Sequence, residues 1–283
     1  MKISILRNFC RLEFDNNSKK VKMIFENRFQ GKVMIVTGAA QGIGKGVAVR
    51  AAQEGAKVIL IDRSEIVNEI SSTLNKNGFD TTAIVEDLEK WEGFQSVVHK
   101  TLEKYDHIDI LINNVGGTIW AKPFDHYEED EVMKEINRSL FPTLWGCRAV
   151  LPSMIQKGGG TIVNVSSVAT RSVNRVPYAA AKGGVNAVTA SLAFEQAPNN
   201  IRVIGVAPGG TQAPPRLIPR NENPQSEQEK IWYQEIIDQT VDSSLQKKYG
   251  EVEDQVNTIL FAASDEAKYI TGVTIPVAGG DLG

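Results

Sequence analysis

The sequence predicts an α/β fold in which a parallel sheet of about seven strands is flanked by helices. Short apolar, β-branched runs recur along the chain, and they are continuous rather than alternating. Such runs are typical of strands that are buried on both faces of a parallel sheet. Stretches of helical length lie between these runs, so strand and helix alternate as they do in β-α-β units.

The expected elements follow one another without an internal repeat or a low-complexity linker, which favours a single domain. We expect strands at 32–38, 56–62, 81–87, 108–114, 160–167, 201–209 and 272–280. We expect helices at 43–54, 65–77, 91–105, 128–155, 178–196 and 251–263.

Composition and charge argue against several classes of function. The 283 residues are 42% hydrophobic and 23% charged, which is ordinary for a globular protein with a substantial core. The net charge is −3 and no basic block stands out, so a nucleic-acid partner is not expected. No run approaches the roughly 18 apolar residues of a membrane-spanning helix, so no membrane partner is expected either.

The cysteines and histidines predict neither disulfides nor a metal site. Cys10 lies in a polar segment and Cys147 in an expected helix, so a disulfide framework is not expected and a reducing cytoplasm fits. The three histidines (His99, His107 and His126) are scattered without the spacing of metal ligands.

Two segments fall outside the alternation of strands and helices. The run "ISIL" near the N-terminus is too short for a signal-peptide core, and Met23 begins a natural domain start. We therefore expect residues 1–22 to be a flexible extension and residues 23–283 to be the folded domain. Residues 212–248 hold four prolines and a polar, helix-like piece, and we interpret them as a lid over the active site, the lid segment.

A glycine loop, "TGAAQGIG" at 37–44, joins the first expected strand to the first helix. Gly38 permits a tight turn, Gly42 lets the backbone approach a pyrophosphate, and Gly44 lets helix and strand pack closely. The free N–H groups and the dipole of a helix start favour a diphosphate. The loop therefore predicts a dinucleotide site, with Gln41 and Ile43 beside the glycines, in a doubly wound, Rossmann-like sheet.

An acidic residue after the second strand indicates which dinucleotide is bound. Asp62 lies 18 residues after Gly44, near the spacing expected for a carboxylate that binds the adenosine ribose. A carboxylate there repels a ribose 2′-phosphate, which favours NAD over NADP, although the adjacent Arg63 could soften this preference. The alternative is that Asp62 only caps a helix or a turn.

The stretch "VPYAAAKGG" (176–184) places Tyr178 and Lys182 four residues apart, on one face of an expected helix. A free tyrosine has a pKa of about 10, and a nearby ammonium favours its phenolate. The pair could therefore supply the base that takes the hydroxyl proton when an alcohol loses hydride. Taken alone, the spacing also fits a surface helix whose tyrosine packs and whose lysine is solvated.

Further motifs occur in order around this pair: "DL" at 87–88, "NNVG" at 113–116, Asn137, "VNVSS" at 163–167 and "PGG" at 208–210. With them, residues 28–283 resemble the short-chain dehydrogenase/reductase family. The resemblance implies an NAD-dependent oxidoreductase with a single Rossmann-like domain that assembles as a homotetramer.

The resemblance also implies roles for individual residues. Tyr178 would be the base, Lys182 would also bind the nicotinamide ribose, Ser167 would hydrogen-bond the reacting oxygen, and Asn137 would hold a proton-relaying water. The implied cofactor contacts are Asp87 and Leu88 beside the adenine, Asn114 and Gly116 after the fourth strand, and Pro208, Gly209 and Thr211 near the nicotinamide.

The chain departs from the family pattern in three places. Val115 stands where the family usually has alanine, and only ten residues separate Ser167 from Tyr178, which shortens the loop over the substrate. Thr211 comes early after Pro208 and Gly209, which puts its contact to the cofactor amide in doubt.

Arginines near the expected site predict an anionic substrate. Arg171 and Arg175 lie in the short loop between Ser167 and Tyr178, and the lid segment adds Arg216 and Arg220. Arginine is the natural bidentate partner of a carboxylate, although each of these could be a solvated surface residue. Trp120 could form an aromatic wall, so we expect a small cyclic substrate that carries a carboxylate.

Within the family, "ATRSVNRVPYAAAKGGVNA" and "APGGTQAPPR" resemble the benzoate cis-diol dehydrogenases. The resemblance implies NAD-dependent oxidation of a cyclic cis-dihydrodiol carboxylate to a catechol with loss of CO2. Another family member, such as a related dihydrodiol dehydrogenase or a 3-oxoacyl carrier-protein reductase, and a non-catalytic dinucleotide sensor stay open as alternatives.

Overall fold

The computed structural model describes residues 11–15, 20–221 and 223–283. Its centre is a seven-stranded parallel sheet in the order β11-β8-β7-β6-β3-β4-β5. The strands are β3 (Val33–Thr37), β4 (Lys57–Asp62), β5 (Thr81–Val85), β6 (Ile110–Asn113), β7 (Gly160–Val165), β8 (Ile201–Pro208) and β11 (Thr274–Val277). Each lies within a range expected from the sequence, so the predicted doubly wound α/β fold is confirmed.

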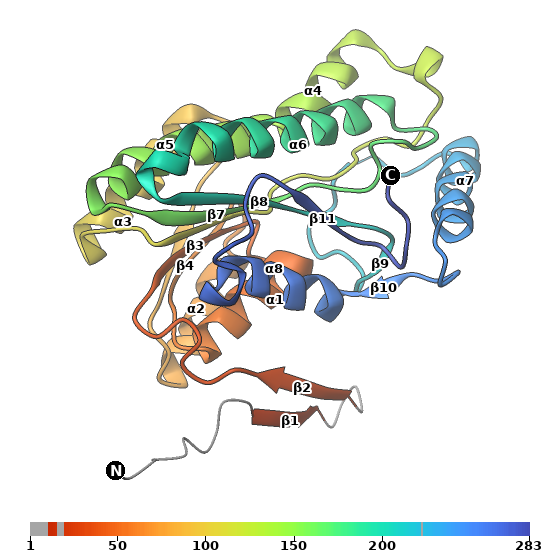
Figure 1. Ribbon diagram of the computed structural model, residues 1–283. Helices are drawn as coiled ribbons and strands as arrows, with labels where there is room; N and C mark the ends of the chain where they lie inside the picture. The colour runs from red at the N-terminus through yellow and green to blue at the C-terminus, as the bar shows by residue number, and fades with distance from the viewer. Residues whose placement is uncertain (1–10, 16–19, 222) are drawn as a thin grey trace, which may run out of the picture.

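Helices cover both faces of this sheet (Figure 1). One face carries α1 (Gly42–Gln53), α2 (Ile66–Lys76) and α8 (Val252–Ala263). The other carries α3 (Trp91–Tyr105), α4 (Glu129–Ser139), α5 (Phe141–Lys157) and α6 (Val176–Gln196). Short 3-10 turns lie at Phe124–His126, Ala197–Asn199 and Asp265–Ala267. No helix in the described part of the chain is long and apolar enough to cross a membrane.

The continuous apolar runs are explained by strands that are buried on both sides. In β3, Met34 and Val36 pack into the cluster under α1, α2 and α8, whereas Val33 and Ile35 pack into the cluster under α3 and α5. All four side chains have no exposed surface. Successive side chains of a strand point to opposite faces, so a strand between two helical layers needs apolar residues at every position.

The order of the strands places a crevice at one end of the sheet. β3 pairs with β4 on one side and with β6 on the other. The chain runs outward from β3 through β4 and β5 and then crosses back to β6. In doubly wound sheets, ligands bind outside the carboxyl ends of the strands at such a switch point.

The long helix expected over 128–155 is two helices in the structure. The break is at Leu140, whose φ of −116° and ψ of −51° depart from helical geometry, and Pro142 lies in the first turn of α5. Proline has no N–H to donate, so it is tolerated at the start of a helix and disfavours continuation of α4 through this point. The break lets α4 pack against α6.

The N-terminal segment also differs from expectation. Strands β1 (Arg11–Asp15) and β2 (Lys20–Ile24) pair as an antiparallel hairpin, drawn below α1 and α2 in Figure 1. The boundary expected after residue 22 falls within β2. A flexible extension was predicted where part of the segment forms this hairpin, and residues 1–10 and 16–19 lie outside the described residues.

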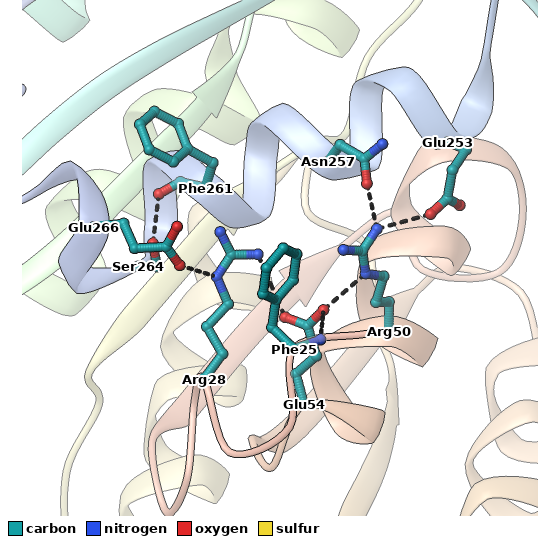
Figure 2. Close-up of polar contacts among 9 residues, drawn as sticks. All are labelled: Phe25, Arg28, Arg50, Glu54, Glu253, Asn257, Phe261, Ser264 and Glu266. Carbon is teal, nitrogen blue, oxygen red and sulfur yellow. Dashed lines mark hydrogen bonds and ion pairs between the residues drawn. The ribbon is translucent and has the colours of Figure 1, made fainter. Parts of the chain in front are cut away.

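A buried ionic network ties the segment after β2 to the core (Figure 2). Glu54, at the end of α1, is fully buried, and its carboxylate lies 2.8 Å from Arg50 Nε and 3.5 Å from Arg28 Nη1. Arg28 also forms an ion pair with Glu266 at 2.8 Å, and Arg50 forms one with Glu253 at 2.7 Å. The network thus joins three parts of the chain that are distant in sequence.

The lid segment contains a well-formed helix, α7 (Glu227–Ser243), at one end of the sheet (Figure 1). A capping box begins this helix: Ser226 Oγ accepts the Glu229 N–H at 3.2 Å, and Glu229 Oε2 accepts the Ser226 N–H at 2.8 Å. Two short parallel strands, β9 (Thr211–Gln212) and β10 (Gly250–Glu251), close the base of the segment.

Candidate active site

The glycine loop has the shape that a diphosphate requires. Gly38 and Gly42 have φ of +65° and +58°, and a Cβ at Gly44 would lie 2.1 Å from the carbonyl oxygen of Gly38. Gln41, at the start of α1, makes no side-chain cap, and the first turn holds no acidic residue. The N–H groups at this helix start therefore remain for an anionic ligand, so the loop fits a dinucleotide.

Asn114, directly after β6, holds the glycine loop in place. Its backbone N–H donates to Thr37 Oγ1 at 2.8 Å, and its Nδ2 donates to the carbonyls of Thr37 at 3.1 Å and Gly38 at 3.3 Å. The neighbouring Asn113 points away into the core, where its Nδ2 donates to Asn164 Oδ1 at 3.0 Å. Asn114 alone of this pair therefore borders the expected cofactor site.

Asp62 lies beside the same loop at the end of β4. Its Oδ2 accepts the Ala40 N–H at 3.1 Å, and its Oδ1 accepts the Ser64 N–H at 3.2 Å. Asp62 thus stabilises the two turns beside it through its carboxylate, and its contact with the adenosine ribose stays a prediction. Farther along this edge, Leu88 is buried, whereas Asp87 is exposed and accepts the Glu89 N–H at 3.1 Å.

Tyr178 and Lys182 are both buried on α6, so the surface-helix alternative is wrong. Lys182 Nζ lies 5.9 Å from the centroid of the Tyr178 ring and donates to the carbonyl of Val165 at 2.7 Å. Burial, and secondarily the charge of Arg220, lowers the pKa of Lys182 to about 7. Gly116 lies next to this ammonium, because a Cβ there would be 3.1 Å from Nζ.

Ser167 follows β7 at the same end of the sheet. Its Oγ donates to the carbonyl of Pro208 at 3.3 Å and accepts the Ala169 N–H at 3.0 Å. Gly209 continues the β8 backbone by donating to Val277 at 3.0 Å. Thr211 Oγ1 donates to the carbonyl of Gly209 at 3.2 Å, and its contact to the cofactor stays a prediction.

Asn137 lies on α4, which packs against α6. Its side chain is half-buried and has no hydrogen-bond partner among the described residues. Trp120 is also half-buried: its N–H donates to Glu135 Oε1 at 3.0 Å, and its carbonyl accepts the Tyr127 hydroxyl at 2.9 Å. These backbone contacts fix Trp120 in the chain that leads from β6 to α4.

The four candidate arginines are placed differently. The guanidinium carbon of Arg175 lies 5.9 Å from the centroid of the Tyr178 ring, and Arg175 Nε donates to Ser172 Oγ at 2.6 Å. Arg220 reaches the site from the lid segment, since a Cβ at Gly117 would lie 2.3 Å from its guanidinium carbon. Arg171 and Arg216 are exposed. In the described part of the chain the Arg171 side chain has no hydrogen-bond or ionic partner.

Two residues of the site were not identified from the sequence as having these roles. Gln41 bridges to the lid segment, where its Oε1 accepts the Leu217 N–H at 2.9 Å. Glu135 is fully buried and accepts the N–H groups of Ile119 at 2.8 Å and Trp120 at 3.0 Å, and burial raises its pKa. No sequence signal marks Glu135, because a glutamate on an acidic helix is expected to be solvated.

Comparison with known proteins identifies the family. The sequence model of the family described as short chain dehydrogenase matches residues 32–223. The chain belongs to the short-chain dehydrogenase family. This membership confirms the resemblance inferred from the glycine loop and the Tyr-Lys pair.

Several dehydrogenases resemble the chain over nearly its whole length. Two are 1,6-dihydroxycyclohexa-2,4-diene-1-carboxylate dehydrogenases. The one from Acinetobacter baylyi is 56% identical over 256 residues, covering 90% of this chain and 98% of the relative. The one from Pseudomonas putida is 59% identical over 256 residues, covering 90% and 94%. A 7alpha-hydroxysteroid dehydrogenase from Bacteroides fragilis is 35% identical, covering 90% and 95%.

Solved dehydrogenase structures share the fold. A 7 alpha-hydroxysteroid dehydrogenase complexed with NADH and 7-oxo glycochenodeoxycholic acid superposes with a TM-score of 0.77 at 27% identity, covering 90% of this chain and 96% of that chain. A short chain dehydrogenase from Mycobacterium smegmatis gives a TM-score of 0.73 at 28% identity, covering 89% and 93%.

Proposed function

We propose that the protein oxidises 1,6-dihydroxycyclohexa-2,4-diene-1-carboxylate with NAD, yielding catechol and CO2, as a step of benzoate degradation. The observation that carries this proposal is the 56–59% identity to two dehydrogenases named for that substrate, against 35% to a hydroxysteroid dehydrogenase. The same proposal places the enzyme in the cytoplasm as a homotetramer, with α5 and α6 as candidate subunit interfaces.

NAD fits the residues at the carboxyl ends of the strands. When bound, it supplies the acceptor for the hydride. The glycine loop would hold its diphosphate, Asp62 its adenosine ribose and Lys182 its nicotinamide ribose. Support comes from the uncapped start of α1 and from the related structure that contains NADH.

Tyr178 would take the proton of the ring hydroxyl while the hydrogen on the same carbon leaves as hydride. Ser167 would donate a hydrogen bond to the reacting oxygen. As Tyr178 loses its own proton to become the base, the negative charge beside Lys182 favours the ammonium form of that lysine. Asn137 would hold a water that passes the proton onward.

The proposed reaction balances without net release of a proton. Oxidation of the secondary alcohol leaves a β-keto acid, whose carboxylate departs as CO2 while its bonding electrons form the aromatic ring. The proton taken from the hydroxyl is matched by the proton gained on decarboxylation. One diol carboxylate and one NAD+ thus give one catechol, one CO2 and one NADH.

A turnover assay with the diol carboxylate tests the proposal. We expect NADH and catechol in equal amounts, measured by absorbance and by chromatography, and a higher kcat/KM with NAD than with NADP because of Asp62. Absence of turnover would refute the substrate assignment. Equal or reversed cofactor preference would refute the ribose-carboxylate argument and point to Arg63.

A further inference from the structure

Three arginines from three segments of the chain border the candidate active site. Arg175 comes from the loop 168–177, Arg220 comes from the lid segment, and Arg138 comes from α4. Arg138 Nη1 donates to the carbonyl of Arg220 at 3.3 Å. Burial lowers the pKa of Arg138 and of Arg175, and the charge of Arg220 lowers both of them further.

Few carboxylates compensate this charge. Glu89 lies 3.9 Å from Arg138 Nε, and the charges of Arg220 and Arg138 act on the buried Glu135, whose Oε1 accepts two backbone N–H groups. Within the described ranges, Arg175 and Arg220 form no ion pair with a carboxylate. The Nε of Arg220 is enclosed and has no acceptor. Enclosed charge without a partner is costly, so this arrangement favours an anionic ligand.

Two of these arginines are placed beside the reacting groups. The guanidinium of Arg175 lies over the ring of Tyr178, 5.9 Å from its centroid. Arg220 packs on Gly117, its Nη1 donates to the carbonyl of Thr118 at 3.5 Å, and its charge acts on Lys182. An anion next to the hydroxyl that reacts at Tyr178 would therefore meet one arginine from the loop and one from the lid segment.

We propose that Arg175 and Arg220 together bind the carboxylate of the substrate. This inference rests on the proposed function, in which the oxidised carbon is bonded to the carbon that bears the carboxyl group. The anion must then sit close to Tyr178 and Ser167. Because Arg220 belongs to the lid segment, binding of the carboxylate also holds that segment over the site.

The test separates recognition of charge from turnover. Benzoate and its neutral amide, benzamide, are titrated calorimetrically into the enzyme with saturating NAD. The wild type should prefer benzoate. Arg220→Ala and Arg175→Ala should each lose roughly 10- to 150-fold in benzoate affinity, the range for a hydrogen bond to a charged group, with little change for benzamide. Arg220→Lys and Arg175→Gln serve as second variants if an alanine variant does not fold.

The matched kinetic experiment compares two diols. The same variants should lose a similar factor in kcat/KM on the diol carboxylate and little on cis-1,2-dihydroxycyclohexa-3,5-diene, which lacks the charge. The control is Lys230→Ala, because Lys230 is a lid cation whose ammonium pairs with Glu227 on the exposed surface of α7. This control should match the wild type in both assays.

Three other outcomes would overturn the inference or separate it from the proposed function. If Arg171→Ala abolishes the benzoate preference and the two proposed arginines do not, the inference is wrong. Reduced NAD affinity in Arg220→Ala with intact benzoate preference would assign that arginine to the cofactor diphosphate and overturn the inference. If the wild type fails to oxidise the diol carboxylate but loses its benzoate preference in both variants, the proposed function fails and the carboxylate site stands.

Discussion

The side chain of Gln41, in the glycine loop, forms hydrogen bonds with both the N–H and the carbonyl of Ile218 in the lid segment. Gln41 Nε2 donates to the Ile218 carbonyl at 3.1 Å, and Gln41 Oε1 accepts the Ile218 N–H at 3.3 Å. The side-chain amide thus acts as a backbone neighbour would in a strand. One residue therefore belongs both to the expected diphosphate site and to the anchor of the lid segment.

Replacing Gln41 should loosen the lid segment without unfolding the domain. In Gln41→Ala, the amides of Leu217 and Ile218 should exchange with deuterium faster, while the melting temperature changes little because the hydrogen bonds lost are those to the lid segment. Gln234→Ala is the matched control, since its amide donates to Asp238 on the exposed surface of α7. Unchanged exchange in Gln41→Ala would mean that the lid segment is held elsewhere.

Removing the phenolic hydroxyl should stop proton transfer and leave the fold intact. Tyr178→Phe keeps the ring and should lose at least about 10²-fold in kcat, the typical contribution of general acid–base catalysis, with similar NAD affinity. Lys182→Ala should lower both turnover and NAD affinity, because its ammonium lies next to Gly116 as well as to the Tyr178 ring. Full turnover by the Phe variant would show that another group is the base.

The buried Lys182 should make stability rise with pH. Its pKa falls from 10.5 in the unfolded chain to about 7 in the fold, so between these values the unfolded state binds the extra proton. The free energy of unfolding then increases with pH by at most about 1.4 kcal/mol per unit. Relative to Lys182→Met, the wild type should gain about 1.5 kcal/mol from about pH 7 to about pH 8.5 in urea titrations. A difference that does not vary with pH would contradict the lowered pKa.

Of the residues that precede the sheet, those after β2 should contribute to stability and residues 1–22 should not. Deleting residues 1–22 should leave melting temperature and activity nearly unchanged, because Arg28 and its network remain (Figure 2). Arg28→Ala should instead cost about 3 kcal/mol in urea unfolding, since it removes one partner of the buried Glu54. Glu266→Ala, which removes the exposed partner of Arg28, should cost less than about 1 kcal/mol. Equal effects of the two substitutions would refute this ranking.

The strands and the cofactor loop could be predicted because their physics is local. Apolar runs such as 32–38 must be buried on both faces, and Gly44 touches the Gly38 carbonyl only six residues away. The break at Leu140 could have been found from Pro142, although the surrounding apolar pattern continues through it. The hairpin at the N-terminus did have a signal, because polar and apolar residues alternate along both Arg11–Asp15 and Lys20–Met23, as they do in a half-buried strand.

The arrangement of the arginines could not be predicted, because it depends on contacts between distant segments. Arg171 and Arg175 are equivalent in the sequence, yet only Arg175 turns toward Tyr178. Arg220 reaches Gly117 across 103 positions of the chain, and the sequence does not specify how the lid segment folds back. The placement of Tyr178 and Lys182 on one helix could thus be predicted, whereas their charged surroundings could not.

The loop 168–177 is bonded to α7 rather than standing alone. Asn174 Nδ2 donates to the carbonyl of Trp232 at 3.0 Å, and Gln239 Oε1 accepts the Ser172 hydroxyl at 3.1 Å and the Val173 N–H at 3.3 Å. Arg175 is fastened to this loop through Ser172. Substrate preference can therefore change through residues that do not contact the substrate. Substitutions at Gln239 would alter the orientation of the Arg175 side chain and leave the residues that contact the substrate ring unchanged. A mutagenesis library aimed at new diols should accordingly include the inner face of α7 as well as the pocket.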